Sequence, residues 1–555
     1  MAKVKKPRAK TSPKEPLGSD HLTMPLFAPG MTALHRAGLG GLACTLKYIE
    51  RAYQQGAFSD DDVPGGPWDD GAAPWEIEAE QITLQFGQPD VAGDYLKRLF
   101  ALSFGVDDGL IRLPGQYDLP PNLAVRADLQ LGLILTFLQH GKTRTLAKEP
   151  IVTAHDPEGN GVPSVIVEYR KCSDYKHQNG WKDCVNEKTG CLSATTVGVE
   201  GPLNPGAVVR HNAFSGLTKI DEPVQRLLPL YFALVGCMAI PVNRGVGVLL
   251  VPEIDNLNDF AVMRPLTTPT SRRQCLTAGA ADAGLQLQVR LRARNLGLTA
   301  CHAITFRPTP WASQQKSRVE SLYIPILEGR DLDIYELALA RLPPRIGIRT
   351  VKESTGRGKA KVTTERRESF RTDSVVRPRI ADNLANGRRW YAGFTRLMTA
   401  INPATDKPYR NQLSFEREGL HDMVTDARAW DDEGEALVVR AVHEAIRQRF
   451  GQIADDYKSN PTGMRNKFNT ERERLRLAFT GAKTVAQART ALCDLFSRGG
   501  PNKPLQQAWQ KILPMFRDDR WQHTRDLALL ALASYSGRGG EGGSNSESEP
   551  IPTKE

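Results

Sequence analysis

Four potential metal ligands lie close together in the sequence: Cys172, His177, Cys184 and Cys191. The stretch between them is polar and rich in turn-forming residues, with no core of its own. Three thiolates and one imidazole could hold a structural zinc ion tetrahedrally. The stretch lacks the CxxC pair that zinc knuckles usually carry, so scattered free thiols are the alternative.

Two acidic runs, Asp60 to Asp62 and Asp69 to Asp70, offer a second possible metal site. Nucleases usually hold divalent cations with clustered carboxylates or histidines. These runs occupy a Pro/Gly-rich loop with no His nearby, so a solvated acidic loop is the alternative. The chain contains no GxxxxGK[ST], HExxH or GxSxG motif, and no GxGxxG after a strand. The sequence therefore predicts a binding protein rather than an enzyme.

Basic and amide side chains gather in several short loops of the first 340 residues. Arg and Lys recognise guanine and phosphates, and Gln recognises adenine. An exposed polar turn is the alternative for each loop alone, but several such loops together favour nucleic-acid binding. The candidate contacts are Lys142, Arg144, Arg244, Arg272, Arg273, Gln274, Gln315, Lys316 and Arg318.

The net charge of +10 is concentrated in particular segments. Residues 341–379 carry 12 basic and 4 acidic residues, whereas residues 21–340 are mildly acidic. This basic segment alternates like two strands, Arg345 to Glu353 and Lys361 to Asp373, and is predicted to pair as a hairpin around two glycines. Its tip would present Arg357, Lys359 and Lys361 to phosphates, although a solvated surface hairpin is the alternative.

After about residue 380 the apolar residues recur with a helical period, and Gly and Pro breakers separate about six or seven helices. Two predicted helices, 382–398 and 415–430, precede the longest one. Cations with nearby aromatics suit a single strand of nucleic acid. The candidates are Arg388 and Arg389 beside Trp390 and Tyr391, then Arg472 and Arg476. For the last two, a solvated helix face with interleaved Glu is the alternative.

The predicted fold class is α+β, with a mixed α/β N-terminal domain followed by an all-α C-terminal helix bundle. Alternating apolar residues predict strands at 82–86, 165–169 and 285–291, and the apolar run 245–251 predicts a buried central strand. Interspersed helices are predicted at 32–53, 128–139 and 224–237. The predicted organisation is a basic disordered tail (1–20), a mixed α/β domain (21–340), a basic hairpin or connector (341–379), a helical bundle (380–535) and a disordered tail (536–555).

Composition indicates an ordinary globular protein without disulfides or membrane spans. The chain has 555 residues, 40% of them hydrophobic and 25% charged, as in ordinary globular proteins. Eight cysteines are too few for a disulfide framework. No apolar run approaches the roughly 20 residues that cross a bilayer, and the basic N-terminus is followed by no apolar signal region. We therefore expect a cytoplasmic protein without membrane contact.

Three segments carry a family resemblance: Leu22 to Ile49, Gly245 to Phe260 and the WASQQKSR stretch at 311–318. The chain resembles the large subunit of a type I CRISPR Cascade complex, in the MYXAN subtype of the Cas-eight family. The resemblance covers most of residues 20–340 and fits the helical C-terminus. None of these segments is a catalytic motif.

The resemblance implies a non-catalytic role in RNA-guided DNA binding. Such subunits read the protospacer-adjacent motif (PAM) in duplex DNA and promote R-loop formation, while guide pairing supplies sequence specificity. Their helical C-terminal part is similar to the small subunit that holds the displaced strand. The implied partners are backbone and handle subunits, small subunits, crRNA, target DNA, and a recruited helicase-nuclease or transposition adaptor. No cofactor is implied, apart from the possible structural zinc.

Among the loop residues, the hypothesis assigns PAM contacts to Lys142, Arg144, Arg272, Arg273, Gln274, Gln315 and Lys316. Two alternatives from other classes remain. The acidic runs or the histidines could serve a metal-dependent nuclease. The Cys/His cluster could stabilise a DNA-binding regulator that acts alone.

Overall fold

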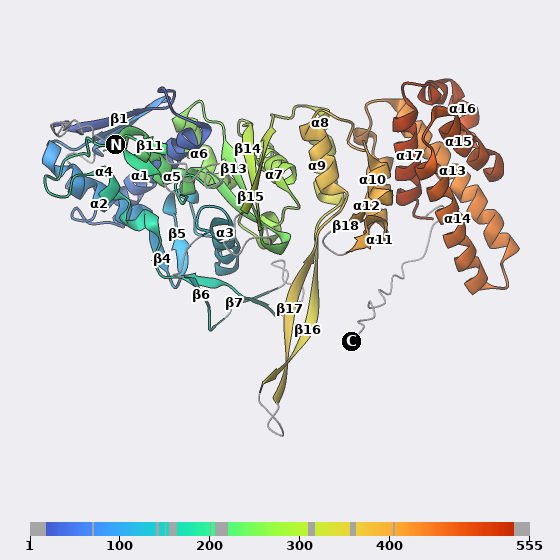
Figure 1. Cartoon of the computed structure of the whole chain (residues 1–555), viewed down its shortest axis with the longest axis horizontal. Coiled ribbons are helices and arrows are strands. Elements are labelled where there is room, and N and C mark those ends of the chain that lie inside the picture. Colours follow the sequence, from blue (N-terminus) through green and yellow to red (C-terminus); the bar gives the residue numbers. More distant parts are fainter. Residues whose placement is uncertain are drawn as a thin grey trace, which may run out of the picture. The chain divides into compact units, whose positions relative to one another are not determined.

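The computed structural model describes residues 18–68, 72–139, 144–149, 151–154, 164–199, 201–205, 220–308, 317–355, 362–402 and 406–537. The chain divides into two compact units. The first, here the α/β unit, comprises residues 1–328 and 344–373, and the second, the helical unit, comprises 329–343 and 374–555. The predicted fold class is confirmed: strands and helices mix in the first unit, and the second ends in helices only (Figure 1).

The α/β unit is built around two helices that pack along each other, α1 (Ala33–Gln54) and α5 (Val224–Gly236). Small residues let their backbones approach closely. A Cβ at Gly41 would lie 2.2 Å from the carbonyl oxygen of Phe232, and one at Gly236 would lie 1.7 Å from that of Ala37. Only glycine fits at these positions, since neither obstacle is a movable side-chain end.

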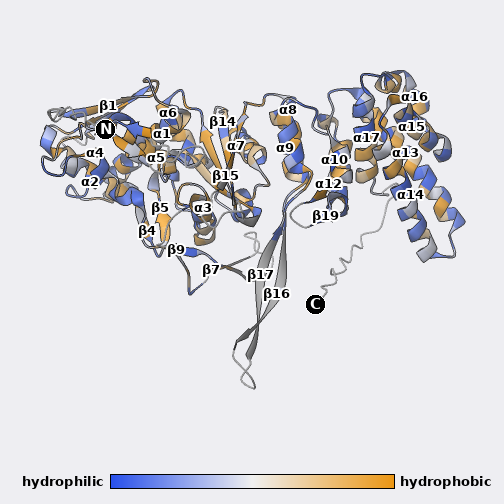
Figure 2. Ribbon diagram, in the orientation of Figure 1, coloured by the Kyte–Doolittle hydropathy of each residue, from blue (hydrophilic) through white to orange (hydrophobic). Residues whose placement is uncertain are grey.

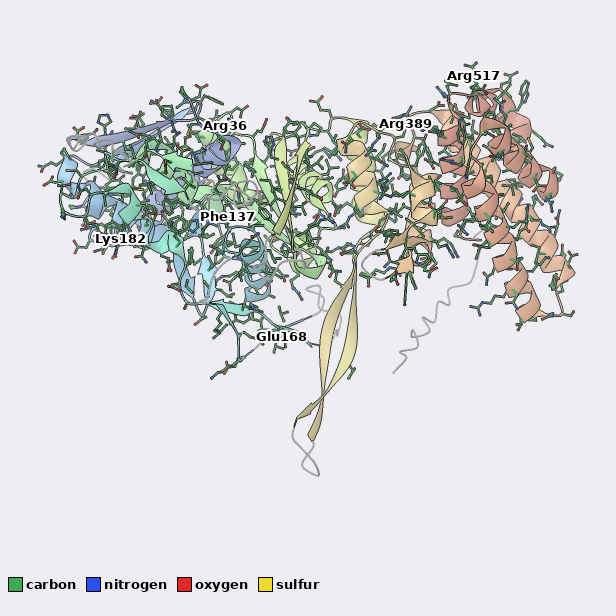
Figure 3. The ribbon with its side chains drawn as sticks, in the orientation of Figure 1. Arg36, Phe137, Glu168, Lys182, Arg389 and Arg517 are labelled. Atoms are coloured by element: carbon green, nitrogen blue, oxygen red, sulfur yellow. The ribbon has the colours of Figure 1, made fainter. Side chains whose placement is uncertain are left out.

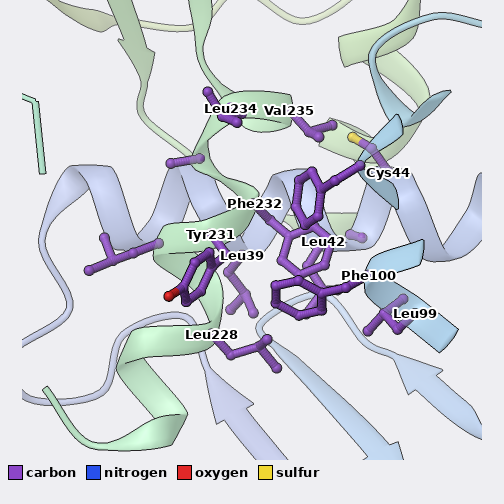
Figure 4. Close-up of a cluster of buried hydrophobic side chains, with 14 of the residues drawn as sticks. Leu39, Leu42, Cys44, Leu99, Phe100, Leu228, Tyr231, Phe232, Leu234 and Val235 are labelled. Carbon is purple, nitrogen blue, oxygen red and sulfur yellow. The ribbon is translucent and has the colours of Figure 1, made fainter. Parts of the chain in front are cut away.

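Aromatic rings fill the core beside this helix pair (Figure 4). Phe100 of α2 (Ala92–Ser103) meets Tyr231 and Phe232 of α5 edge to face, with ring centroids 5.4 and 5.6 Å apart. All three side chains are fully buried. Burial of such a ring stabilises a fold by roughly 1.5–3 kcal/mol.

An antiparallel four-stranded sheet in the order β12-β13-β14-β15 forms the second half of this unit. Helix α3 packs against β12 and β13, and α7 against β13, β14 and β15. The predicted buried central strand is therefore confirmed as β13. The elements are β12 (Met238–Val242), β13 (Val246–Pro252), β14 (Cys301–Pro308), β15 (Ser317–Ile324), α3 (Leu123–Leu135), α6 (Leu257–Thr267) and α7 (Ala280–Ala293).

The strand predicted at 285–291 is wrong, because these residues lie in α7. The alternation of Leu with Gln suggested one buried and one solvated face. In the structure the glutamines are buried as well: Gln286 donates to the Leu276 carbonyl, and Gln288 donates to that of Pro325. With satisfied amides on both sides, the helix has no polar face that a periodicity argument could detect.

Shorter strands complete the α/β unit. β3 lies between β1 and β2, and β17 of the basic hairpin meets β8 at one parallel pair, Glu368 with Ile166. The bounds are β1 (His21–Pro25), β2 (Trp75–Ile77), β3 (Gln81–Gln85), β4 (Gly105–Asp107), β5 (Leu110–Arg112), β6 (Arg144–Leu146), β7 (Ile151–Ala154), β8 (Ser164–Val167), β9 (Arg170–Cys172), β10 (Val197–Val199) and β11 (Ile220–Glu222).

The predicted hairpin of the basic segment is confirmed. β16 (Arg345–Thr355) pairs with β17 (Val362–Thr372) in antiparallel register along its whole length. Strands of this length span roughly 36 Å at 3.3 Å per residue, and the hairpin projects away from the other sheets of its unit (Figure 1). The tip, with Arg357, Lys359 and Lys361, lies outside the described residues.

The helical unit begins with α8 (Arg330–Arg341), which packs on α9 and α12. Residues 330–340, assigned by sequence to the first domain, therefore belong with the C-terminal helices. The bundle that follows is centred on α13 (Glu433–Asp456), which contacts all the later helices. These are α14 (Pro461–Gly481), α15 (Val485–Gly499), α16 (Lys503–Ile512) and α17 (Trp521–Ser534).

The single helix predicted at 382–398 is two helices, α9 (Arg377–Ala385) and α10 (Phe394–Thr399). Gly387 and Gly393 adopt positive φ between them, and the Asn383 amide donates to the carbonyls of Trp390 and Ala392 to close the turn. α11 (Tyr409–Leu413) and α12 (Arg417–Thr425) follow, so the helix predicted at 415–430 is shorter than expected. Within the described residues, no helix is both long and apolar enough to span a bilayer.

Candidate nucleic-acid interface

The Cys/His cluster does not form a metal site. All four residues are described, and the described part of the chain contains no group of three metal-ligating side chains that could hold an ion. His177 is instead fully buried against Phe104, Tyr175 and Tyr231, with ring centroids 5.7–5.9 Å away. Burial lowers the pKa of His177 to about 3, so the ring is neutral.

The three thiols near His177 have separate environments. Cys172 donates to the Asp174 carbonyl, Cys184 is fully buried, and Cys191 donates to the Thr189 carbonyl. Burial also raises the pKa of Cys184, which keeps this thiol protonated. This arrangement resembles a packed core more than a zinc site.

The first acidic run makes local hydrogen bonds. Asp60 accepts from the Tyr53 hydroxyl at 2.6 Å, and Asp62 accepts from the backbone and hydroxyl of Ser59. The Ser59 hydrogen bonds lower the pKa of Asp62. Asp69 and Asp70 lie outside the described residues. Nothing in the described part of this loop resembles a two-metal nuclease centre.

The register of the four-stranded sheet brings several predicted contacts to one end. The β12–β13 turn follows Val242 and contains Arg244. Gly247, just after this turn, pairs with Phe306 near the end of β14, and Pro308 pairs with Ser317 at the start of β15. The strand residues that flank positions 309–316 therefore share an end of the sheet with Arg244. Arg318 is in the second position of β15.

Two more elements meet this end. Thr277 bridges to Val242, which places the 3-10 turn Arg272–Cys275 beside the β12–β13 turn. A Cβ on Gly247 would touch Leu135 and Thr136, so the C-terminal end of α3, just before Lys142 in the sequence, is also here. We call this surface, built from 243–245, 272–277, 306–308, 317–318 and the end of α3, the sheet-end surface.

The base of the basic hairpin is attached to the same surface. Arg371, near the end of β17, donates to the carbonyl of Thr277 and pairs with Asp373. Sequence reasoning did not single out Arg371, and no local pattern distinguishes it from the other hairpin cations. The contact shows that the hairpin is rooted where the loop cations gather.

The 272–274 turn exposes the charge of Arg273, while Arg272 and Gln274 are held by contacts within the protein. Arg272 pairs with Asp128 of α3 at 2.9 Å. The Gln274 side chain accepts from the Thr270 backbone, and Arg290 donates to the Gln274 carbonyl. Arg273 is exposed and has no ion-pair partner among the described residues. The turn is therefore a braced platform with Arg273 as its accessible charge.

For some predicted contacts the structure describes only the backbone, and others lie outside the described residues. Arg144 lies in β6 opposite Cys172, and Arg244 and Arg318 are placed as above, but their side chains are not described. Lys142, Gln315 and Lys316 lie outside the described residues. Among the described PAM candidates, Arg272, Arg273 and Gln274 lie at the sheet-end surface. Arg144 is not placed there, because its strand β6 pairs with β9.

In the helical unit, charge is often already neutralised. Arg389, labelled in Figure 3, pairs with Asp431 at 2.5 Å and with Glu435 at 3.4 Å. It lines a pocket of about 210 Å³ together with the exposed Arg388. Arg476 pairs with Glu473 and donates to the Met398 carbonyl. Arg472 is different, because no carboxylate among the described residues pairs with it.

The prediction that Trp390 and Tyr391 are available to a single strand is wrong, because both side chains are buried. Trp390 and Tyr391 are 3% and 2% exposed, and Trp390 donates its indole N–H to the Ala429 carbonyl. The turn between α9 and α10 directs them into the core while Arg388 and Arg389 stay outside. A half-buried cation that sequence reasoning missed is Arg417, which is flanked by Glu416 and Glu418 and so looks neutralised in the sequence.

Two comparisons now identify the class of protein. Residues 23–231 match the model of the DevT N-terminal domain, and residues 426–554 match that of the DevT C-terminal domain. The chain is also 37% identical, over 98% of its length and 92% of the relative's, to the CRISPR-associated protein Cas8a1/Csx13 of Myxococcus xanthus (strain DK1622).

The chain therefore belongs to the Cas8a1/Csx13 family of CRISPR-associated proteins. This confirms the resemblance seen in the sequence, to a large subunit of type I CRISPR Cascade of the MYXAN subtype.

Proposed function

We propose that this chain reads the PAM in duplex DNA as the non-catalytic large subunit of a cytoplasmic Cascade complex. In this proposal the sheet-end surface contacts the duplex, and the helical unit holds the displaced strand during R-loop formation. The partners are crRNA, backbone and handle subunits, small subunits, and a recruited helicase-nuclease or transposition adaptor. Guide pairing supplies the sequence specificity, so a few base contacts suffice.

The observation that carries the proposal is the convergence at one end of the sheet. The Arg244 turn, the Arg272–Gln274 platform, the start of β15 and the root of a basic hairpin meet there. A short DNA motif needs a few positioned cations and amides on a rigid base. The hairpin could then follow the duplex backbone by phosphate contacts, which orient a protein without reading sequence.

The test uses the full chain assembled with crRNA and its partner subunits. Arg273→Gln is expected to weaken binding to a PAM-containing duplex by about 5- to 150-fold, since a good bidentate contact contributes about 1–3 kcal/mol. Assembly of the complex should be unchanged. The measurement is equilibrium binding to labelled duplexes with and without the PAM.

Arg294→Gln is the matched control. Arg294 is exposed and follows α7 at the end far from Thr277, about 21 Å along a helix of 14 residues. This variant removes the same charge and should bind the PAM duplex like the unmodified chain. Equal affinity of the Arg273 and Arg294 variants would contradict the assignment of Arg273.

The absence of catalysis is tested separately. The purified chain, incubated with duplex or single-stranded DNA and divalent cations, should leave the DNA intact. Catalytic cleavage that persists through purification would contradict the proposal and favour the nuclease alternative. Tight PAM-independent duplex binding without crRNA or partners would instead favour a regulator that acts alone.

A further inference from the structure

Arg417 and Arg472 are among the arginines of the helical unit that have no carboxylate partner in the described part of the chain. Arg417 begins α12, and Arg472 lies in the middle of α14. Both are half-buried. The neighbours of Arg472 on α14 are paired: Arg474 with Glu471 and Asp494, and Arg476 with Glu473. Arg472 is therefore unpaired beside paired arginines of the same helix.

One donor of this pair of arginines also lacks an acceptor. The Nε atom of Arg417 is buried and has no hydrogen-bond partner, and the same is true of the Nδ1 atom of His421, one turn along α12. Buried polar groups are almost always hydrogen-bonded, so these orphans together indicate a missing partner.

The two charges influence each other. Burial lowers the pKa of Arg417. Burial, with the charge of Arg417, lowers the pKa of Arg472 to about 10. Both guanidinium groups remain charged at neutral pH, so the cluster carries two positive charges that partly repel each other. An anion placed between them would remove this repulsion.

An aromatic framework holds the cluster in place. The Arg472 guanidinium lies over the ring of Phe450, 5.2 Å from its centroid, and Phe450 contacts Tyr535 at 5.6 Å. Tyr535 meets His443, which stacks on His421. The rings extend from α14 to α12, so the flat face of Arg472 is occupied while its N–H edge is available.

We propose that Arg417, His421 and Arg472 form a seat for one phosphate group of a single nucleic-acid strand. The inference rests on the proposed function, because the displaced strand is the ligand that the helical unit would hold. Arginine N–H groups suit phosphate oxygens by bidentate hydrogen bonds. The strand continues along α14, where exposed Arg465 lies two turns before Arg472 on the same face, on a largely hydrophilic helix (Figure 2).

The test measures single-stranded DNA binding by the full chain across a range of salt concentrations. The double variant Arg417→Gln with Arg472→Gln is expected to bind about tenfold more weakly. The slope of log affinity against log salt should also fall by about 0.7 for each lost phosphate contact. Single-stranded RNA of the same sequence is the second arm, and stronger binding of DNA supports the displaced strand as the source.

The matched control is Arg517→Gln. Arg517 is exposed, precedes α17, and lies about 20 Å along that helix from Tyr535 (Figure 3). It should leave both the affinity and the salt slope unchanged. If the double variant binds single-stranded DNA like the Arg517 variant, the seat is refuted.

Thermal unfolding separates a binding role from a structural one. Removing two unpaired, mutually repelling charges should leave the melting temperature unchanged or raise it. Inorganic phosphate should raise the melting temperature of the unmodified chain and not that of the double variant. A fall in melting temperature that accounts for the lost affinity would overturn the proposal, as would phosphate binding without strand binding.

Assembly of the complex distinguishes a failure of the phosphate seat from a failure of the proposed function. Complexes of the double variant with crRNA and partner subunits should assemble and bind the PAM duplex initially like the unmodified chain. Failure of the unmodified chain to join such a complex refutes the proposed function. Normal assembly with unchanged strand binding by the double variant refutes the seat alone.

Discussion

The two units offer positive charge to a ligand in different ways. The α/β unit places its cations on turns at one end of a sheet, where a hydrogen-bonded platform leaves Arg273 exposed. The helical unit carries many arginines, but about half of those described are paired with carboxylates, several of them three or four residues away on the same helix. A count of basic residues therefore overstates the positive charge that the helical unit has available for a ligand.

The units also differ in how their helices pack. In the α/β unit the α1–α5 contact is backbone against backbone at glycines. In the helical unit α13 presents buried side chains such as Val442 and Ile446 to its neighbours, with a close backbone approach at Gly499. The first kind of contact tolerates no added atom. The second tolerates exchange of similar volumes.

The largest expected effect follows from this difference. Gly236→Ala should lower the free energy of unfolding of the α/β unit by about 3 kcal/mol, because the new Cβ collides with the Ala37 carbonyl. Gly451→Ala in α13 is the control, since nothing lies within 4 Å of its Cβ position, and it should stabilise by up to about 1 kcal/mol. Chemical denaturation measures both changes. A neutral Gly236 variant would show that the two helices can separate freely.

A second comparison uses one buried histidine from each unit. Burial lowers the pKa of His177 to about 3 and that of His443 to about 4, both from 6.5. The unfolded chain therefore binds these protons at higher pH than the folded chain does. The stability that depends on the neutral rings is present above pH 6.5 and is lost as the pH falls toward 4 for His443 and toward 3 for His177.

Each group should contribute a slope of about 1.4 kcal/mol per pH unit within its window. His177→Phe, which keeps an aromatic ring among Phe104, Tyr175 and Tyr231, should remove this contribution from the α/β unit only. His443→Gln should remove it from the helical unit only. Unfolding monitored between pH 3 and 7 gives the slopes. Unchanged slopes in both variants would mean that these rings are accessible to solvent protons in the folded chain.

The smallest effect concerns the paired arginines of α14. Arg474→Gln and Arg476→Gln should change single-stranded DNA affinity by less than about twofold, because their charges are already neutralised by Glu471, Asp494 and Glu473. Each should lower stability by only about 0.5 kcal/mol. A tenfold loss of affinity in either variant would remove the distinction drawn here between paired and unpaired cations.

Local patterns predicted several elements of the fold correctly. The run of apolar residues at 245–251 predicted a strand buried on both faces, observed as β13, and the alternating basic segment with a glycine-containing turn predicted the hairpin. The pattern failed at α7, where buried glutamines with satisfied amides imitate a strand. It also failed at Trp390 and Tyr391, because the direction of a side chain in a turn depends on tertiary contacts such as those of Asn383.

The candidate site was predictable only in part. Residue type and loop position singled out Arg244, Arg273 and Gln274, but their common location depends on strand register and on the Thr277–Val242 bridge. Arg417 could not be found this way, since adjacent glutamates in sequence say nothing about which charges meet in space. Helical spacing accounts for pairs such as Arg474 with Glu471, but a partner on another element depends on the folded chain.

The glycines between α1 and α5 also explain part of the sequence by which the family was recognised. The stretch Leu22 to Ile49, which made the family recognisable, contains Gly38 and Gly41, and both sit against the backbone of α5. A segment fixed by such steric demands can persist in descendants whose surface turns have diverged. The resemblance carried by this segment therefore reports on helix packing, and the ligand that the surface turns recognise must be determined separately.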